Sequence, residues 1–168
     1  EKLKSSFTVI GLARRAVSKT PITTYQYDLT TLDAGSFPDI TADACIMLSS
    51  ITDIKVCEEK PLDAFEVNVV GMIRTVRFLK ARNVRQLIYF STGTVCSGTG
   101  LPIREDCLPE PPNLYSLTKS LAEQVAKYHS TNLQTLVVRP FFVYGPRTRG
   151  QRLIFNLINE IAAGKNIK

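Results

Sequence analysis

The stretch QLIYF, residues 86–90, is a short continuous apolar run that predicts a β-strand buried inside a sheet. In the segment before it, apolar residues recur with the period of an α-helix, at Phe65, Val69, Met72, Ile73, Val76 and Leu79. After it come a loop rich in glycine and proline over 92–112 and a second helix, which we expect to be capped near Asn113. A buried strand between two helices predicts an α/β fold.

The same alternation extends over the whole chain. Further strands are predicted at 7–13, 23–27, 44–50 and 135–143, followed by a Gly145–Pro146 turn and a final helix over 153–161. The stretch 44–50 is continuous and apolar, so we expect it to be buried on both faces. Such alternation predicts a parallel sheet with right-handed crossovers, and the absence of a linker or repeat predicts one domain. Ligands of these sheets bind at the carboxyl ends of the strands, where Ser49, Thr92 and the turn after Arg139 fall.

Composition is that of an ordinary globular domain, with 44% hydrophobic and 21% charged residues. The net charge of +6 comes from lysines and arginines scattered along the chain, without the basic stripe typical of nucleic-acid binding. A modest positive charge instead suits anionic small molecules. Apolar runs are too short to span a bilayer and no signal peptide is visible, so neither nucleic acid nor membrane is an expected partner.

The four cysteines, Cys45, Cys57, Cys96 and Cys107, show neither a CxxC motif nor metal-ligand spacing. We therefore expect reduced thiols, a cytoplasmic protein and no metal site. His129 is the only histidine and lies among polar residues, which argues against a catalytic triad based on histidine.

The stretch YSLTK, residues 115–119, places a tyrosine and a lysine one helical turn apart on the same face. A nearby ammonium stabilises the phenolate and lowers the pKa of a phenol, so Tyr115 and Lys119 are candidates for an acid/base pair. An amphipathic helix with one tyrosine and one surface lysine would give the same spacing, so the rest of the chain has to decide.

Several stretches, taken together, resemble the extended short-chain dehydrogenase/reductase family of NAD(P)-dependent nucleotide-sugar epimerases, dehydratases and reductases. They run in the family's order from about residue 7 to the end of the chain: YDL at 27–29, ADACIMLSS at 42–50, NVVG at 68–71, YFSTGTVCSG at 89–98, YSLTK at 115–119 and VRPFFVYGPR at 138–147. The resemblance implies a Rossmann-like doubly wound parallel sheet that binds NAD(P).

The resemblance also implies roles for individual residues. Tyr115 would exchange a proton with the substrate, Lys119 would lower the Tyr115 pKa and hold the nicotinamide ribose, and Thr92 would hydrogen-bond the substrate oxygen. Ser91 or Thr94 is the alternative to Thr92, because the loop matches the family with a one-residue ambiguity. The implied cofactor-binding residues are Ala13, Arg14, Arg15, Asp28, Leu29, Leu48, Ser49, Ser50, Asn68, Ser91, Tyr115, Lys119, Pro140, Phe141 and Val143.

Three of these assignments have structural alternatives. Thr92 could be a turn hydroxyl at a strand end, Asp28 a cap or turn residue, and Asn68 a polar group at a helix start rather than one that orients a water or backbone group near Lys119.

The chain departs from the family pattern at both ends. The Gly-x-x-Gly-x-x-Gly loop is missing, and EKLKSS at 1–6 resembles the end of the helix that should follow it. The resemblance therefore implies an incomplete sheet, with the first strand, the Gly-rich loop and a carboxyl-terminal substrate region absent. We expect residues 1–168 to be a single partial NAD(P)-binding domain that binds dinucleotide weakly or not at all on its own.

Smaller departures concern the reaction. Cys96 and Ser97 replace the usual Tyr-Gly, and Phe142 replaces an asparagine common near the substrate pyrophosphate. Gly93 and Thr94 stand where dehydratases carry an acidic pair, which disfavours dehydration. The predicted activity is epimerisation of a nucleotide sugar. Reduction of a keto-sugar nucleotide or related carbonyl with NADPH, and a catalytically silent binding module, are the alternatives.

Two further expectations concern cofactor and assembly. NAD-preferring members carry an acidic residue at the end of the strand that here ends at Ala13, whereas this chain continues with Arg14 and Arg15, so NADP(H) is favoured. Family members often dimerise through two helices, which correspond here to 62–82 and 113–130. We therefore expect a homodimer.

Overall fold

The structure is a computed structural model that describes residues 2–15, 21–31, 40–97, 102–145 and 153–165. Its strands are β1 (Ile10–Ala13), β2 (Thr23–Gln26), β3 (Ala44–Met47), β4 (Gln86–Phe90) and β5 (Gln134–Val138). Its α-helices are α1 (Ile54–Glu59), α2 (Pro61–Phe65), α3 (Gly71–Ala81), α4 (Leu114–Tyr128) and α5 (Leu153–Ala162). Shorter helical turns are η1 (Lys2–Ser5), η2 (Glu66–Val70) and η3 (Gly93–Cys96).

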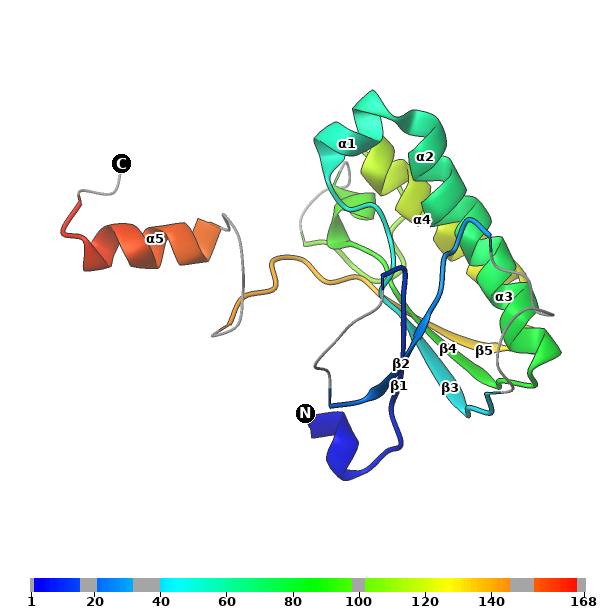
Figure 1. Cartoon of the computed structure of the whole chain (residues 1–168). Coiled ribbons are helices and arrows are strands. Elements are labelled where there is room, and N and C mark those ends of the chain that lie inside the picture. Colours follow the sequence, from blue (N-terminus) through cyan, green and yellow to red (C-terminus); the bar gives the residue numbers. More distant parts are fainter. Residues whose placement is uncertain (1, 16–20, 32–39, 98–101, 146–152, 166–168) are drawn as a thin grey trace.

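The strands form two parallel sheets in the described part of the chain. β1 pairs with β2, and β4 lies between β3 and β5, with Ile88 opposite both Ile46 and Leu136. Helices α1–α4 lie together on one side of the β3–β4–β5 sheet, while α5 stands apart from it (Figure 1). The predicted α/β fold with parallel strands is confirmed.

The core lies between the β3–β4–β5 sheet and the helices. Leu87 and Tyr89 point from β4 into a buried cluster with Met72 and Val76 of α3 and Ala122 of α4. The next residues along each strand face the other way. On that face Ile46, Ile88 and Leu136 form an apolar row in which Ile46 is 44% and Leu136 52% exposed. The expectation that 44–50 is buried on both faces is therefore wrong, because the described helices cover only one face.

Most predicted strands are too long at one end. β1 begins at Ile10, since Phe7 is exposed, and β3 ends at Met47. β5 ends at Val138, just before Arg139 and Pro140, because a proline has no N–H to offer to a strand ladder. The predicted Gly145–Pro146 turn lies partly outside the described residues. The strand 86–90 has the predicted bounds.

The helix predicted over 65–79 is longer and interrupted by a π-helical turn. α2, η2 and α3 follow one another with helical backbone angles at both junctions, such as φ −59° and ψ −46° at Glu66. The π-turn carries the buried Asn68, whose Oδ1 accepts from Ile51 N at 2.8 Å. Asn68 Nδ2 donates to Ile51 O at 3.0 Å and to Thr118 Oγ1 of α4 at 2.9 Å. One amide thus ties the loop after β3 to α4.

Helix α4 starts as the sequence predicts. The Asn113 side chain caps it by accepting from Ser116 N at 2.9 Å. Leu114 N donates to Glu58 Oε1 of α1 at 2.9 Å, which holds the first turn of α4 against α1. This start fixes the position of Tyr115 in the first turn of the helix and of Lys119 one turn later.

Candidate functional site

The candidate residues of the five strands gather at one edge of the fold, because parallel strands all end on the same side. Each set lies at or just after the end of its strand: Ala13 at the end of β1, with Arg14 and Arg15 after it; Asp28 and Leu29 after β2; Leu48, Ser49 and Ser50 after β3; Ser91 and Thr92 after β4; Pro140, Phe141 and Val143 after β5. The ends of β4 and β5 are joined, since Ser91 N donates to Val138 O at 2.8 Å and Gly93 N to Pro140 O at 2.9 Å. A Cβ on Gly93 would come within 2.6 Å of the Phe141 ring.

A cavity of about 490 Å³ brings together part of the predicted cofactor set. Arg14, Asp28, Leu29, Ser49 and Ser50 line it, whereas Ala13, Arg15, Leu48 and the residues after β5 are not among its lining residues. Asp63 and Glu66 also line it. The sequence did not single out these two residues, because acidic side chains in the first turns of a surface helix carry no functional signal of their own.

Asp28 has a turn role. Its Oδ1 accepts from Thr30 N at 2.9 Å and from Thr30 Oγ1 at 2.8 Å. These bonds, with a smaller contribution from the positive charge of Arg14, lower the pKa of the Asp28 carboxyl. The turn alternative raised by the sequence is therefore realised in the structure, and the same turn leaves Asp28 on the wall of the cavity.

Lys119 is buried, with only 2% of its surface exposed. Its Nζ donates to Phe90 O at 2.6 Å and lies 4.3 Å from the centroid of the Tyr89 ring. Burial lowers its pKa to about 8, although the negative charge of Glu123 acts in the opposite direction. Lys119 is therefore an ammonium group aimed from α4 at the end of β4, and not a surface lysine.

A chain of hydroxyls connects the end of β4 to the helix of Tyr115. Thr92 caps η3, and its Oγ1 lies 3.0 Å from Thr94 Oγ1, which lies 2.8 Å from Ser116 Oγ. Ser116 is fully buried and adjoins Tyr115 in α4. A role for Ser116 was not predicted from the sequence, because a serine inside a helix gives no sign of a partner 22 residues away. Thr94, the alternative to Thr92, is part of the same chain.

Tyr115 is half-buried in the first turn of α4. Burial and the negative charge of Glu123 raise the pKa of Tyr89, and the charge of Tyr115 makes a smaller contribution in the same direction. At the end of β4, Ser91 Oγ is buried and has no hydrogen-bond partner in the described part of the chain. Buried hydroxyls without a partner are uncommon in proteins. Ser91 therefore offers a polar contact to a molecule bound at this edge.

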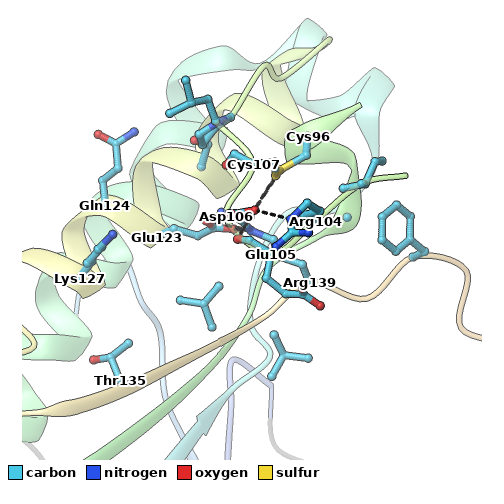
Figure 2. A pocket seen from close by; sticks show the side chains of 18 of the residues that line it. Cys96, Arg104, Glu105, Asp106, Cys107, Glu123, Gln124, Lys127, Thr135 and Arg139 are labelled. Carbon is cyan, nitrogen blue, oxygen red and sulfur yellow. Dashed lines mark hydrogen bonds and ion pairs between the residues drawn. A yellow bond between two sulfur atoms is a disulfide. The ribbon is translucent and has the colours of Figure 1, made fainter. Parts of the chain in front are cut away.

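A larger cavity, of about 940 Å³, lies elsewhere, between α4 and the end of β5 (Figure 2). Its walls include Cys96, Cys107, Glu123 and Arg139, but neither Tyr115 nor Lys119. We place the candidate active site at the strand ends and not in this cavity, because the hydroxyl chain and the buried lysine are there.

Cys96 and Cys107 form a disulfide, so the expectation of reduced thiols is wrong for this pair. The loop that follows residue 101 folds back across η3, where Glu110 N donates to Val95 O at 2.8 Å, and the Cα atoms of the two cysteines lie 6.2 Å apart. A separation of 11 residues between two cysteines does not reveal such a return of the chain. Cys45 and Cys57 are free.

Within the described residues, no cluster of histidine, cysteine, aspartate and glutamate side chains is suited to hold a metal ion. The helices of the same residues include none with the length and apolar character needed to cross a membrane.

Comparison with known proteins gives a consistent family. The sequence profile described as NAD dependent epimerase/dehydratase family matches residues 1–168. The chain is 31% identical to UDP-glucuronate 4-epimerase of Thermodesulfobacterium geofontis, over 86% of this chain and 46% of that protein. It is 29% identical to GDP-6-deoxy-D-mannose reductase of Pseudomonas aeruginosa, over 84% of this chain and 49% of that protein. The chain thus spans about half the length of these relatives.

Solved structures show the same fold. MoeE5 in complex with UDP-glucose and NAD superposes with a TM-score of 0.82 at 23% identity, over 99% of this chain and 57% of that one. RMD from Pseudomonas aeruginosa, complexed with NADPH, superposes with a TM-score of 0.71 at 27% identity, over 89% of this chain and 55% of that one.

The burial of Lys119 predicts a pH-dependent contribution to stability. Between its folded pKa of about 8 and its ordinary value of 10.5, the unfolded chain holds a proton that the folded chain has released. The free energy of unfolding of the full-length protein should therefore rise relative to that of Lys119→Met, by about 1 kcal/mol per pH unit above about pH 8. Urea denaturation at several pH values measures the difference. Lys127→Met, at an exposed position of the same helix, should show no such rise. A difference in the free energy of unfolding between the unmutated protein and Lys119→Met that does not change with pH would contradict the burial of Lys119.

Proposed function

Because the chain belongs to the NAD-dependent epimerase/dehydratase family, we propose that the full-length protein is an NAD(P)-dependent epimerase of a nucleotide sugar. The observation that carries the proposal is the link between the end of β4 and α4, where Lys119 donates to Phe90 O and the Thr92–Thr94–Ser116 chain ends next to Tyr115, together with the 31% identity to a UDP-glucuronate 4-epimerase. A silent binding module would have no need to retain all three side chains.

The residues present fit a nicotinamide dinucleotide. Ser91 Oγ offers an unused hydrogen-bonding group, and the cavity lined by Arg14, Ser49 and Ser50 lies at the ends of β1 and β3, where dinucleotides bind in this type of sheet. Structural relatives bind NAD and NADPH. The bound dinucleotide would supply a hydride acceptor and donor.

The chain's own groups move and hold protons. The Tyr115 phenol exchanges a proton with a substrate hydroxyl or keto oxygen. Lys119 keeps a positive charge at neutral pH, which favours the phenolate of Tyr115. The Thr92 hydroxyl, aligned by Thr94 and Ser116, donates to the same substrate oxygen and stabilises the charge that develops there.

A second candidate function is reduction of a keto-sugar nucleotide or related carbonyl. Arg14 lines the 490 Å³ cavity and Ala13 gives the end of β1 no carboxylate, which suits the 2′-phosphate of NADPH. The relative in Pseudomonas aeruginosa is a GDP-6-deoxy-D-mannose reductase. Dehydration is not proposed, because Gly93 and Thr94 provide no acid/base group.

We assign residues 1–168 to one partial dinucleotide-binding domain. Its two sheets are not hydrogen-bonded to each other in the described residues, and a cavity of about 170 Å³ lies between β1 and β3, lined by Ile10, Leu12, Cys45 and Ile46. A parallel strand at this position would join the sheets and carry a phosphate-binding loop. We also propose a cytoplasmic location, in keeping with the free thiols of Cys45 and Cys57.

We propose a homodimer formed by the helices of segments 62–82 and 113–130. Leu62, Ile73 and Leu117 are 83%, 37% and 36% exposed on these helices, while Val125 packs against the core. The double variant Ile73→Glu/Leu117→Glu should therefore be a monomer, because it places charges in the apolar interface. Sedimentation at micromolar concentration measures the mass. Leu108→Glu, at an exposed loop position, should leave the dimer intact, and a monomeric unmutated protein would rule out the interface.

The catalytic assignment predicts the effect of removing one hydroxyl. In the full-length protein, Tyr115→Phe should lower turnover about 10²- to 10⁴-fold, as expected for the loss of a general acid/base, while cofactor affinity persists. Tyr128→Phe, at an exposed position of the same helix, should have no effect. Turnover of Tyr115→Phe close to that of the unmutated enzyme would remove Tyr115 from the mechanism.

The cofactor preference is tested at Arg14. The unmutated protein should bind NADPH more tightly than NADH. The dissociation constant of NADH divided by that of NADPH should fall about tenfold in Arg14→Ala, because the variant loses a charge-assisted hydrogen bond to the 2′-phosphate. Both constants are measured at fixed salt, with the exposed Arg77→Ala as control. Tighter binding of NADH by the unmutated protein would reject the preference, and an unchanged ratio in the variant would show that Arg14 does not set it.

A further inference from the structure

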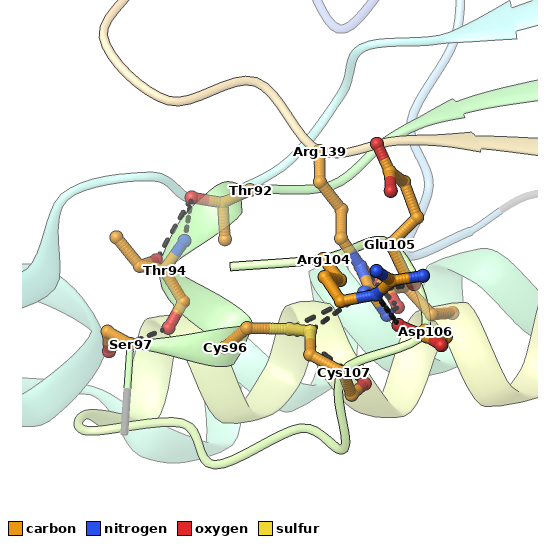
Figure 3. The surroundings of a disulfide bond; sticks show 10 residues. Thr92, Thr94, Cys96, Ser97, Arg104, Glu105, Asp106, Cys107 and Arg139 are labelled. Atoms are coloured by element: carbon orange, nitrogen blue, oxygen red, sulfur yellow. Dashed lines mark hydrogen bonds and ion pairs between the residues drawn. A yellow bond between two sulfur atoms is a disulfide. The ribbon is translucent and has the colours of Figure 1, made fainter. Parts of the chain in front are cut away.

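The Cys96–Cys107 disulfide joins the candidate active-site loop to a second loop (Figure 3). Cys96 is the last residue of η3, the short helical turn that Thr92 caps, and it is 1% exposed. Cys107 lies in the loop before α4 and is half-buried. A covalent bond therefore connects a segment that carries Thr92 and Thr94 to one that lies nearer the surface.

Arg139 holds a guanidinium group beside both sulfur atoms. Its Nη1 lies 3.4 Å from Cys96 Sγ and 3.4 Å from Cys107 Sγ, and it donates to Glu105 O at 3.3 Å. Its Nε and Nη2 donate to Glu123 at 3.0 Å and 2.6 Å, so the group is fixed in place. A guanidinium next to a cysteine favours the thiolate, which is both the nucleophile and the leaving group of disulfide exchange.

The disulfide is also accessible. Both cysteines line the cavity of about 940 Å³, which is large enough for a small thiol (Figure 2). Attack is expected at Cys107, since it is more exposed than Cys96. In reducing compartments, disulfides are usually transient and either catalytic or redox-sensing.

We propose that Cys96–Cys107 is a thiol–disulfide exchange site for small thiols, and that its oxidation orders the loop that carries Thr92. The effect on activity rests on the proposed function, whereas the exchange reaction does not. Besides the disulfide, the Glu110–Val95 hydrogen bond joins the two loops, and Arg139 contacts both of them through Cys96 Sγ and Glu105 O. Reduction removes the covalent link and leaves η3 held by such weaker contacts.

The reaction balances with thiol as the only co-reactant. A thiolate RS⁻ attacks Cys107 Sγ, the bond between the sulfurs breaks, and its electron pair leaves on Cys96 Sγ as a thiolate beside Arg139. A second RS⁻ attacks the RS sulfur of the mixed disulfide and releases RSSR, which leaves Cys107 as a thiolate. The protein disulfide gains two electrons, two thiols are oxidised to one disulfide, and the protons of the thiols pass to the cysteines or to solvent.

The exchange is tested by equilibrating the full-length protein in buffers with different ratios of reduced to oxidised glutathione. Free thiols are then alkylated under denaturing conditions and located by mass spectrometry. Cys96 and Cys107 should pass together from a linked peptide to alkylated thiols across the series, while Cys45 and Cys57 are alkylated throughout. In Cys96→Ser, Cys107 should carry glutathione in the oxidised buffers. A pair that is never linked, or that stays linked in the most reducing buffer, would overturn the proposal.

The loop effect is measured without reference to activity. Amide hydrogen exchange of residues 92–97 should be faster in the reduced than in the oxidised protein, and Cys107→Ser should show the fast rate in both buffers. The variant Cys45→Ala should behave like the unmutated protein. Equal exchange in both redox states would overturn the ordering of the loop.

Turnover provides the link to function. Reduction should lower it by about tenfold, because small displacements of a positioning group cost large factors in rate. Turnover that is equal in both states would overturn the control of activity. An enzyme that is inactive on every nucleotide sugar, yet shows redox-dependent exchange of residues 92–97, would reject the proposed function and not the exchange site.

Discussion

Burial of one face of α4 against β4 is the constraint on which the candidate site depends. Ala122 and Ala126 place this face in the core, and the helical period then fixes what the rest of the helix presents. One turn before Ala122, Lys119 points at Phe90 O, and Glu123 follows to hold Arg139. The apolar packing thus fixes where the charged groups lie, and the low dielectric of the same packing lowers the pKa of Lys119.

The π-turn in the preceding helix supplies the second constraint. An extra residue in one helical turn changes which side chains face inward, and short π-helical turns occur often at functional sites. Here the turn carries Asn68, which bonds the backbone of Ile51 on one side and Thr118 on the other. Ile51 belongs to the wall of the proposed cofactor cavity, and Thr118 adjoins Lys119. One buried amide therefore couples the proposed cofactor-binding and proton-transfer parts of the site.

The sequence predicted what depends on local pattern. The parallel α/β order, the strand 86–90, the Asn113 cap and the placement of the candidate residues after their strands follow from periodicity, capping chemistry and the geometry of parallel sheets. Features set by contacts between distant segments were not predicted: the Thr94–Ser116 bond, the π-turn and the Cys96–Cys107 pair. Strand ends were misjudged, since apolar residues continue beyond Met47 and Val138, where β3 and β5 have already ended. At β5 the reason is Pro140, which has no N–H to offer to a strand ladder. The sequence also gave no sign that the apolar row of Ile46 and Leu136 would lack cover.

That uncovered row bears on how the chain behaves when it is produced by itself. Ile46, Ile88 and Leu136 form an apolar strip across three strands, and Leu136 lies on β5, the last strand of its sheet in the described residues. Apolar strips next to open sheet edges favour stacking and strand addition between copies. We therefore expect this 168-residue segment, produced in isolation, to self-associate as its concentration rises. A longer segment whose added residues cover the strip should be more soluble.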